Sequence, residues 1–204
     1  PWSLVPDRKI TVEDVKYVLS SYYQGTPFNP YAQHGDPNLR GKYRPIGINR
    51  NNFVAITQLR PYVPAEMMGV EWIAVGSNAF NEAVPFYANV NATPAYLANT
   101  GKDADTNNFY WANRLAGALA DAHYAACISH VERYQLKLAS EGHRLLKEFD
   151  EAYQAKPAED ATAYLTECNQ KIADTAQALT TDLLNKVLFS ASVEMKNAFA
   201  RSDA

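Results

Sequence analysis

Three residues that could bind a metal or perform nucleophilic catalysis lie on one expected helical face. His123, Cys127 and His130 follow each other at steps of four and three residues, which brings them together on an α-helix. A zinc site needs four ligands, and no fourth candidate ligand is adjacent. Catalytic thiols occupy exposed, electropositive places, whereas Cys127 and the second cysteine, Cys168, fall within apolar helical stripes. We therefore expect structural roles for these residues, no metal site and no cofactor.

The densest basic cluster offers another possible site. Arg40, Lys42, Arg44 and Arg50 lie within eleven residues. Such a cluster can be a solvated loop edge, or it can aim an arginine into a cleft to bind an anion. The tripeptide at 76–78, Gly-Ser-Asn, follows an apolar segment and could form an oxyanion-binding turn or a turn that anchors the backbone, although such tripeptides are common. No Walker loop, dinucleotide fingerprint or zinc-protease motif is present, so those mechanisms receive no support.

Composition excludes several classes of protein. The 204 residues are 47% hydrophobic and 20% charged, with a net charge of −3, which excludes a disordered chain and argues against a nucleic-acid partner. No apolar run approaches the roughly 20 residues that cross a bilayer, so no membrane partner is expected. Two cysteines do not form a disulfide scaffold, and this fits a cytoplasmic location.

The chain changes character near residue 104. Ten of the eleven prolines and seven of the nine glycines precede it, so residues 1–104 are predicted to be a sheet-and-loop portion and residues 105–204 a helical one. Thr11 and Asp14 have capping-box spacing and predict a helix that ends by residues 24–27. A polar loop is expected over 28–41. Strands are expected at 43–49, 53–60, 70–77 and 86–90, the first two joined by a turn at 50–52.

In the strands expected at 53–60 and 70–77 the apolar residues do not alternate cleanly and the second run is nearly continuous, which predicts strands covered on both faces. The helical portion has an apolar residue at every third or fourth position from Phe109 to Phe149, and we expect a bend or break near Gly142. Pro157 separates this segment from a second stripe that runs from Leu165 to Val187. The two together predict a long antiparallel helical hairpin.

Several short motifs, taken in order, resemble the thiol dipeptidases of lactic acid bacteria. The likeness covers roughly residues 1–155, and its specificity lies in the order of the motifs. The segments are PWSLVPDRKITVEDV at 1–15, YYQGTP at 22–27, RPIGI at 44–48, QLR at 58–60, EW at 71–72, VPFY at 84–87 and YWA at 110–112.

That resemblance implies an N-terminal nucleophile hydrolase, whose αββα sandwich stacks two antiparallel sheets between helical layers. It implies acyl transfer through a cysteine at the mature N-terminus, whose α-amino group is the base, without a metal. Residue 1 here is Pro, so the nucleophile is expected upstream of Pro1. The chain is then expected to be the C-terminal portion of a cysteine-dependent dipeptidase, one α+β domain incomplete at its N-terminus. Its expected partners are a dipeptide, the upstream half of the same polypeptide and further copies in a homo-oligomer.

The resemblance also implies auxiliary residues in this chain. Arg44 is the first candidate for a cation near the nucleophile and Arg40 the second, while Asn78 and Tyr87 are candidate substrate-binding residues at strand ends. The isolated chain is expected to be inactive, because it holds no nucleophile at a chain end. The alternative is a non-catalytic self-association module. A sheet edge or apolar face left open favours the first hypothesis, and a sealed core favours the second.

Overall fold

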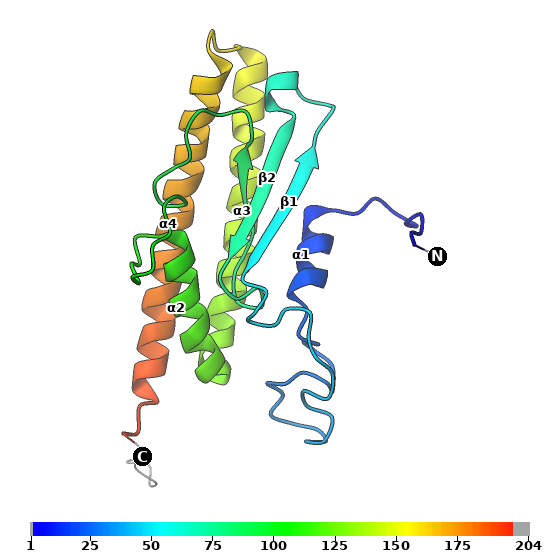
Figure 1. Ribbon diagram of the computed structural model, residues 1–204, viewed down its shortest axis with the longest axis vertical. Coiled ribbons are helices and arrows are strands. Elements are labelled where there is room, and N and C mark those ends of the chain that lie inside the picture. Colours follow the sequence, from blue (N-terminus) through cyan, green and yellow to red (C-terminus); the bar gives the residue numbers. More distant parts are fainter. Residues whose placement is uncertain (1, 198–204) are drawn as a thin grey trace.

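The computed structural model describes residues 2–197, in which four α-helices pack with one three-stranded antiparallel sheet (Figure 1). The elements in chain order are α1 (Val12–Ser20), β1 (Phe53–Leu59), a 3-10 turn η1 (Ala65–Met67), β2 (Gly69–Val75), β3 (Val84–Tyr87), α2 (Phe109–Ala122), α3 (Tyr124–Ala155) and α4 (Ala161–Val193). The expected α+β class is confirmed. In this part of the chain no helix is long and apolar enough to cross a membrane.

The helix α1 forms where its capping signal predicts. The Thr11 hydroxyl accepts a hydrogen bond from the Asp14 amide at 3.2 Å, and the Asp14 carboxylate accepts one from the Thr11 amide at 2.9 Å. These reciprocal bonds satisfy two amides that the first helical turn leaves without partners. The remaining 32 residues up to β1, 21–52, form neither helix nor strand, which confirms the expected polar loop and extends it.

The expected strand at 43–49 is wrong, and so is the hairpin turn expected after it. This segment has no neighbouring strand, because β1 pairs only with β2 and the sheet order is β1-β2-β3. The segment instead packs on the C-terminal end of α1. The Gly47 amide donates to the Ser21 carbonyl at 2.8 Å, and a Cβ added at Gly47 would lie 2.2 Å from the Ser20 carbonyl oxygen. Only glycine permits this approach.

One face of the sheet packs against α3. Trp72 of β2 and Pro85 of β3 are register partners and lie on this face, where Trp72 is 1% exposed. Gly142 of α3 lies directly over them, since a Cβ there would be 2.8 Å from Pro85 Cδ. The glycine is therefore part of the helix–sheet contact and lies inside α3, so a break at this position is wrong, whereas a bend there stays a prediction.

The break between helices falls at His123 instead. Its backbone (φ −127°, ψ 46°) leaves the helical region and separates α2 from α3. The hairpin itself is confirmed: α3 and α4 are in contact along their length, run in opposite directions and are joined by residues 156–160 (Figure 1). The stripe residues Cys127, Leu138, Leu165 and Val187 are each at most 2% exposed, as the periodicity predicts.

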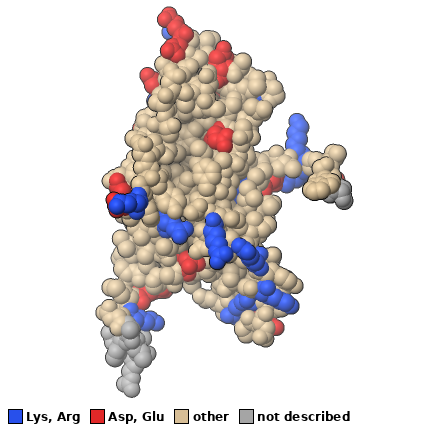
Figure 2. Space-filling model, viewed as in Figure 1, with Lys and Arg blue, Asp and Glu red and all other residues tan. Residues whose placement is uncertain are grey.

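The other face of the sheet is open over β1. Phe53 is 59% and Leu59 70% exposed, and Ala55 and Thr57 between them are exposed as well. The expectation that the strands are covered on both faces is thus wrong for β1, although all four residues of β3 are buried. Figure 2 shows that this side of the molecule carries few charges over the sheet, whereas basic side chains gather over the loop region below it.

Candidate functional site

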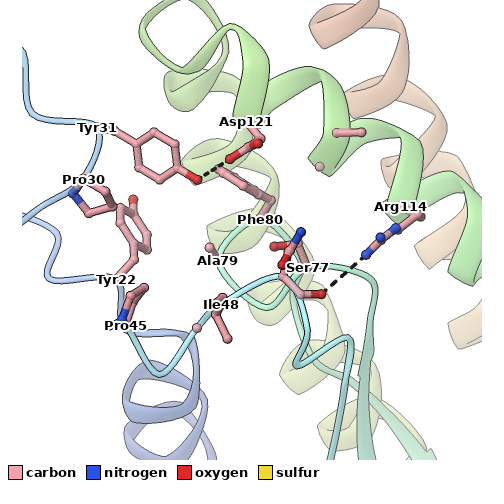
Figure 3. A pocket seen from close by; sticks show the side chains of 14 residues that line it. Tyr22, Pro30, Tyr31, Pro45, Ile48, Ser77, Ala79, Phe80, Arg114 and Asp121 are labelled. Carbon is pink, nitrogen blue, oxygen red and sulfur yellow. Dashed lines mark hydrogen bonds between the residues drawn. The ribbon is translucent and has the colours of Figure 1, made fainter. Parts of the chain in front are cut away.

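A cavity of about 360 Å³ lies where the long loop after α1, the turn after β2 and helix α2 meet (Figure 3). Its volume is within the usual range of small-molecule sites. Segments far apart in the sequence form its walls. They contribute Tyr22, Pro30, Tyr31, Pro45, Gly47, Ile48 and Asn49 from the loop, Ser77, Ala79 and Phe80 from the turn, and Arg114, Gly117, Ala118 and Asp121 from α2.

Gly76 brings the turn after β2 against α2. Its φ of +83° lies in the left-handed region, which glycine adopts at little cost. A Cβ at this position would lie 3.1 Å from the Asn113 Cβ and 3.2 Å from the Arg114 amide nitrogen. The close approach of the two segments is why Ser77 and Arg114 line the same cavity.

The buried lysine Lys16 forms hydrogen bonds with the turn that follows β2. Lys16 of α1 is 5% exposed, and its ammonium donates to Ser20 Oγ at 2.7 Å and to the carbonyls of Asn78 and Asn81 at 3.1 and 3.0 Å. All three of its donors are therefore used. Burial lowers the pKa of Lys16 from its usual value. Gln135 of α3 donates to the Asn81 carbonyl as well, so two helices fix the turn that carries Ser77.

Aromatic rings form the wall opposite α2. Tyr31 stacks on Tyr124 with ring centroids 4.2 Å apart and planes 5° apart, and Tyr22 meets Tyr124 through hydroxyl groups 2.9 Å apart. Phe80 also belongs to this cluster, since its ring centroid lies 6.0 Å from that of Tyr31. Burial is the main cause that raises the pKa of Tyr22 and of Tyr31 above the ordinary value. Both phenols are therefore neutral near pH 7 and act as hydrogen-bonding groups.

The two ends of the cavity carry opposite charges. Arg114 and Asp121 both belong to α2 and both line the cavity (Figure 3). The Arg114 guanidinium donates from Nη1 to the Asn49 carbonyl at 3.5 Å, a long contact that uses one of its five N–H donors. The Asp121 carboxylate accepts a hydrogen bond from the Tyr31 hydroxyl. A zwitterionic ligand would complement this arrangement.

The two arginines singled out from the sequence lie outside these walls. Arg44 is an exposed loop residue, immediately before Pro45, which does line the cavity. Arg40 is half-buried; its Nη2 donates to the Gly35 carbonyl at 3.4 Å and its buried Nε has no hydrogen-bond partner in residues 2–197. An auxiliary catalytic role for either residue stays a prediction.

Asn78 and Tyr87, the candidate substrate-binding residues, are both 1% exposed. The side-chain oxygen of Asn78 accepts a hydrogen bond from Asn81 at 3.2 Å, so Asn78 lies behind the cavity wall that its neighbour Ser77 forms. The Tyr87 hydroxyl donates to Asp150 at 2.8 Å. Tyr87 also borders a second, apolar cavity of about 520 Å³ on the open side of the sheet. Contact of either residue with substrate stays a prediction.

The cysteines and histidines of the helical stripe lie away from the cavity walls. Cys127 is fully buried, with its Sγ 3.8 Å from the Val187 carbonyl, and burial raises the pKa of its thiol. Burial likewise raises the pKa of Cys168, to about 11. His123 contacts Glu194 at 2.6 Å. Among residues 2–197, no three His, Cys, Asp or Glu side chains are grouped so that they could hold a metal ion.

Sequence reasoning missed Arg114 and Asp121, which are the charged residues of the cavity. The spacing of the two residues was an available signal, because residues seven apart on a helix share a face. Both charges also lie in a segment that consists mostly of apolar and small residues, FYWANRLAGALADA. That pattern does not reveal which loop faces the helix. The facing loop is set by the long-range contacts of Gly47 and Gly76.

Comparison with known proteins places most of the chain in one family. Residues 1–137 match the family model described as Peptidase family C69. The chain is 42% identical over 241 residues to a dipeptidase of Bifidobacterium longum (strain NCC 2705), covering all of this chain and 45% of that protein. It is 46% identical over 202 residues to a probable dipeptidase A of Streptococcus pyogenes serotype M18, covering 99% of this chain and 42% of that protein.

A third relative, a probable dipeptidase B of Lactococcus lactis subsp. lactis (strain IL1403), is 39% identical over 203 residues, covering all of this chain and 42% of that protein. With a family match over more than half of its length, the chain belongs to peptidase family C69. It spans less than half of the length of these relatives.

Proposed function

We propose that this chain is the C-terminal portion of a cysteine-dependent dipeptidase and supplies most of the substrate-binding cavity. The observation that carries the proposal is a cavity with one cationic and one anionic end, Arg114 and Asp121, in a member of peptidase family C69. A free dipeptide has one charge of each sign at its two ends. The relatives named dipeptidase, of which the chain covers less than half, support the same substrate class.

The nucleophile is proposed to come from a segment upstream of Pro1. Cys127 and Cys168 are the only cysteines of the chain, and both are buried with a pKa raised by burial. A thiol attacks as its thiolate, which needs a lowered pKa and access to the substrate. Neither residue fits that description. We therefore expect this chain alone to be inactive on dipeptides.

The open side of the sheet supports an upstream half as partner. Exposed Phe53 and Leu59 lie on this face of β1, and the 520 Å³ apolar cavity beside Ile73 and Phe86 opens on the same side. Uncovered apolar surface of this kind marks an interaction site. A second sheet supplied by the upstream half would cover it and would complete the proposed αββα sandwich.

In the proposed reaction, the upstream thiolate attacks the carbonyl carbon of the dipeptide's peptide bond. The tetrahedral intermediate collapses, the C–N bond breaks, and the leaving amine takes the proton that the base removed from the thiol. A thioester remains, and water hydrolyses it to release the first amino acid and the thiol. Arg44 and Arg40 remain proposed auxiliaries, with Asn78 and Tyr87 as proposed substrate-binding residues.

A cysteine-to-serine experiment tests the origin of the nucleophile. The whole protein with Cys127→Ser and Cys168→Ser together is expected to hydrolyse dipeptides within about threefold of the unmodified protein, and iodoacetamide is expected to inactivate both. The circular dichroism spectrum confirms that the variant is folded. A folded double variant without activity, or an unmodified enzyme that resists iodoacetamide, would contradict the proposal.

Self-association is the second candidate function, because the same apolar face could be covered by another copy of this chain. The two functions predict different outcomes. If the upstream half covers the face, the charged substitution Leu59→Lys disrupts the docking of the two halves and lowers dipeptidase activity. If another copy covers it, the same variant changes the mass measured by light scattering and leaves the activity as it was. A homo-oligomer that uses another surface and a cytoplasmic location stay predictions.

A further inference from the structure

The two charged residues of the cavity lie on one helix. Arg114 and Asp121 are seven residues apart on α2, which corresponds to two helical turns and about 10.5 Å along the axis. Both side chains are directed into the same cavity from this one rigid element (Figure 3). The helix therefore fixes the two backbone positions from which the charged side chains extend.

Both charged groups keep hydrogen-bonding capacity for a ligand. Among residues 2–197, neither Arg114 nor Asp121 forms an ion pair within 4.0 Å. Arg114 uses one N–H on the Asn49 carbonyl, and Asp121 accepts from Tyr31. A guanidinium presents a planar pair of N–H groups that matches a carboxylate, and a carboxylate with further lone pairs can accept from an ammonium.

A dipeptide is long enough to contact both residues. Two residues of extended chain span at most about 7 Å, and a charge-assisted contact of about 2.8 Å at each end brings the span to about 12–13 Å, which is of the same order as the axial separation of about 10.5 Å between the two positions. The rings of Tyr22, Tyr31 and Phe80 offer apolar contact to the side chains between the ends.

We propose that Asp121 binds the α-ammonium group and Arg114 the α-carboxylate group of a free dipeptide. This inference rests on the proposed dipeptidase function and adds the residues that bind the two charged ends of the substrate. Tyr31 acts as a positioning residue, because its hydroxyl orients the Asp121 carboxylate.

The test compares substrates that lack one charged end. The whole protein and its variants Arg114→Gln and Asp121→Asn are assayed on a free dipeptide, the same dipeptide with a C-terminal amide, and the same dipeptide with an N-acetyl group. Arg114→Gln is expected to lower kcat/KM for the free dipeptide by roughly 10- to 100-fold, mainly through KM, as loss of a charge-assisted bond implies. It should leave the amide unchanged, because that substrate has no carboxylate to bind.

Asp121→Asn is expected to show the mirror pattern, with a loss on the free dipeptide and none on the N-acetyl substrate. Arg133→Gln, at an exposed position of α3, is the matched control and should change none of the three. Equal losses on the free and blocked substrates would show a merely structural role and overturn the inference. Unchanged selectivity in both variants would overturn it while the dipeptidase proposal stands. An unmodified whole protein that hydrolyses no free dipeptide would overturn both.

Discussion

Replacing Asp150 with alanine is expected to destabilise the protein strongly, because it leaves a buried cation without its partner. Asp150 of α3 forms two contacts with the guanidinium of Arg60, Nη1–Oδ2 at 2.6 Å and Nη2–Oδ1 at 3.3 Å. The side chains of Arg60 and Asp150 are 4% and 12% exposed. Tyr87 donates to the same carboxylate, and Arg60 Nη2 also donates to the Met67 carbonyl at 2.7 Å. The pair joins the end of β1 to α3.

The size of the effect follows from the desolvated charge. Removing one partner of a buried ion pair typically costs about 3–5 kcal/mol, mostly because the remaining charge has lost its solvation and its partner. Domains of this size are stable by only about 5–15 kcal/mol. Asp150→Ala is therefore expected to remove about 4 kcal/mol from the free energy of unfolding. Replacing both partners, Arg60→Met with Asp150→Leu, is expected to recover most of that loss.

Urea unfolding followed by circular dichroism measures these differences. Asp182→Ala is the matched control, since it removes the same side chain from an exposed pair with Lys186 on α4 and should leave the urea midpoint nearly unchanged. A loss below about 1 kcal/mol for Asp150→Ala would refute the claim that Arg60 is left unsolvated. A double variant as unstable as the single one would refute the unpaired charge as the cause.

Three further predictions concern the loop and the thiols. Gly47→Ala is expected to detach the loop from α1, because the added Cβ would collide with the Ser20 carbonyl. Limited proteolysis should then cut residues 21–52 faster. Gly101→Ala is the control and should not change the cleavage, because a Cβ at position 101 has no atom within 4 Å. Cys127 and Cys168 are expected to resist a thiol reagent at pH 8 in the folded protein and to react in urea, because both are buried and burial raises the pKa of both thiols. For Cys168, a pKa of about 11 leaves about one thiol in a thousand ionised at pH 8. Because folding raises the pKa of Cys168 from its ordinary 9.0 to about 11, its contribution to stability is complete below pH 9 and is lost as the pH rises through 11. The urea midpoint should fall over that interval, and less so in Cys168→Ala.

The motifs that resemble the dipeptidases acquire physical roles in the fold. The QLR segment ends in Arg60, which forms the buried pair with Asp150, and begins with Gln58, whose side-chain oxygen accepts from the Trp72 indole at 3.0 Å. The RPIGI segment contains Gly47, the contact point with α1. These motifs hold distant elements together, so their order along the chain carries information about the fold.

The sequence by itself determined the features that depend on local signals. The Thr11 cap placed α1, apolar periodicity placed the hairpin of α3 and α4, and branched and aromatic residues placed β1 and β2. In each case the residues that decide the structure are neighbours in the chain, or repeat with the period of the element. The arginine cluster suggested Arg44 and Arg40 as auxiliary residues, and that role stays a prediction.

The tertiary structure alone decided the features that depend on distant partners. Residues 43–49 have strand composition but no strand beside them, so they pack on α1 through Gly47. The helix break lies at His123, whereas Gly142 serves as the contact with Pro85. The cavity has its charges on α2 and its aromatic wall largely on a loop some ninety residues earlier. A single sequence does not specify such pairings, because the free energy of each contact depends on which surfaces the whole fold brings together.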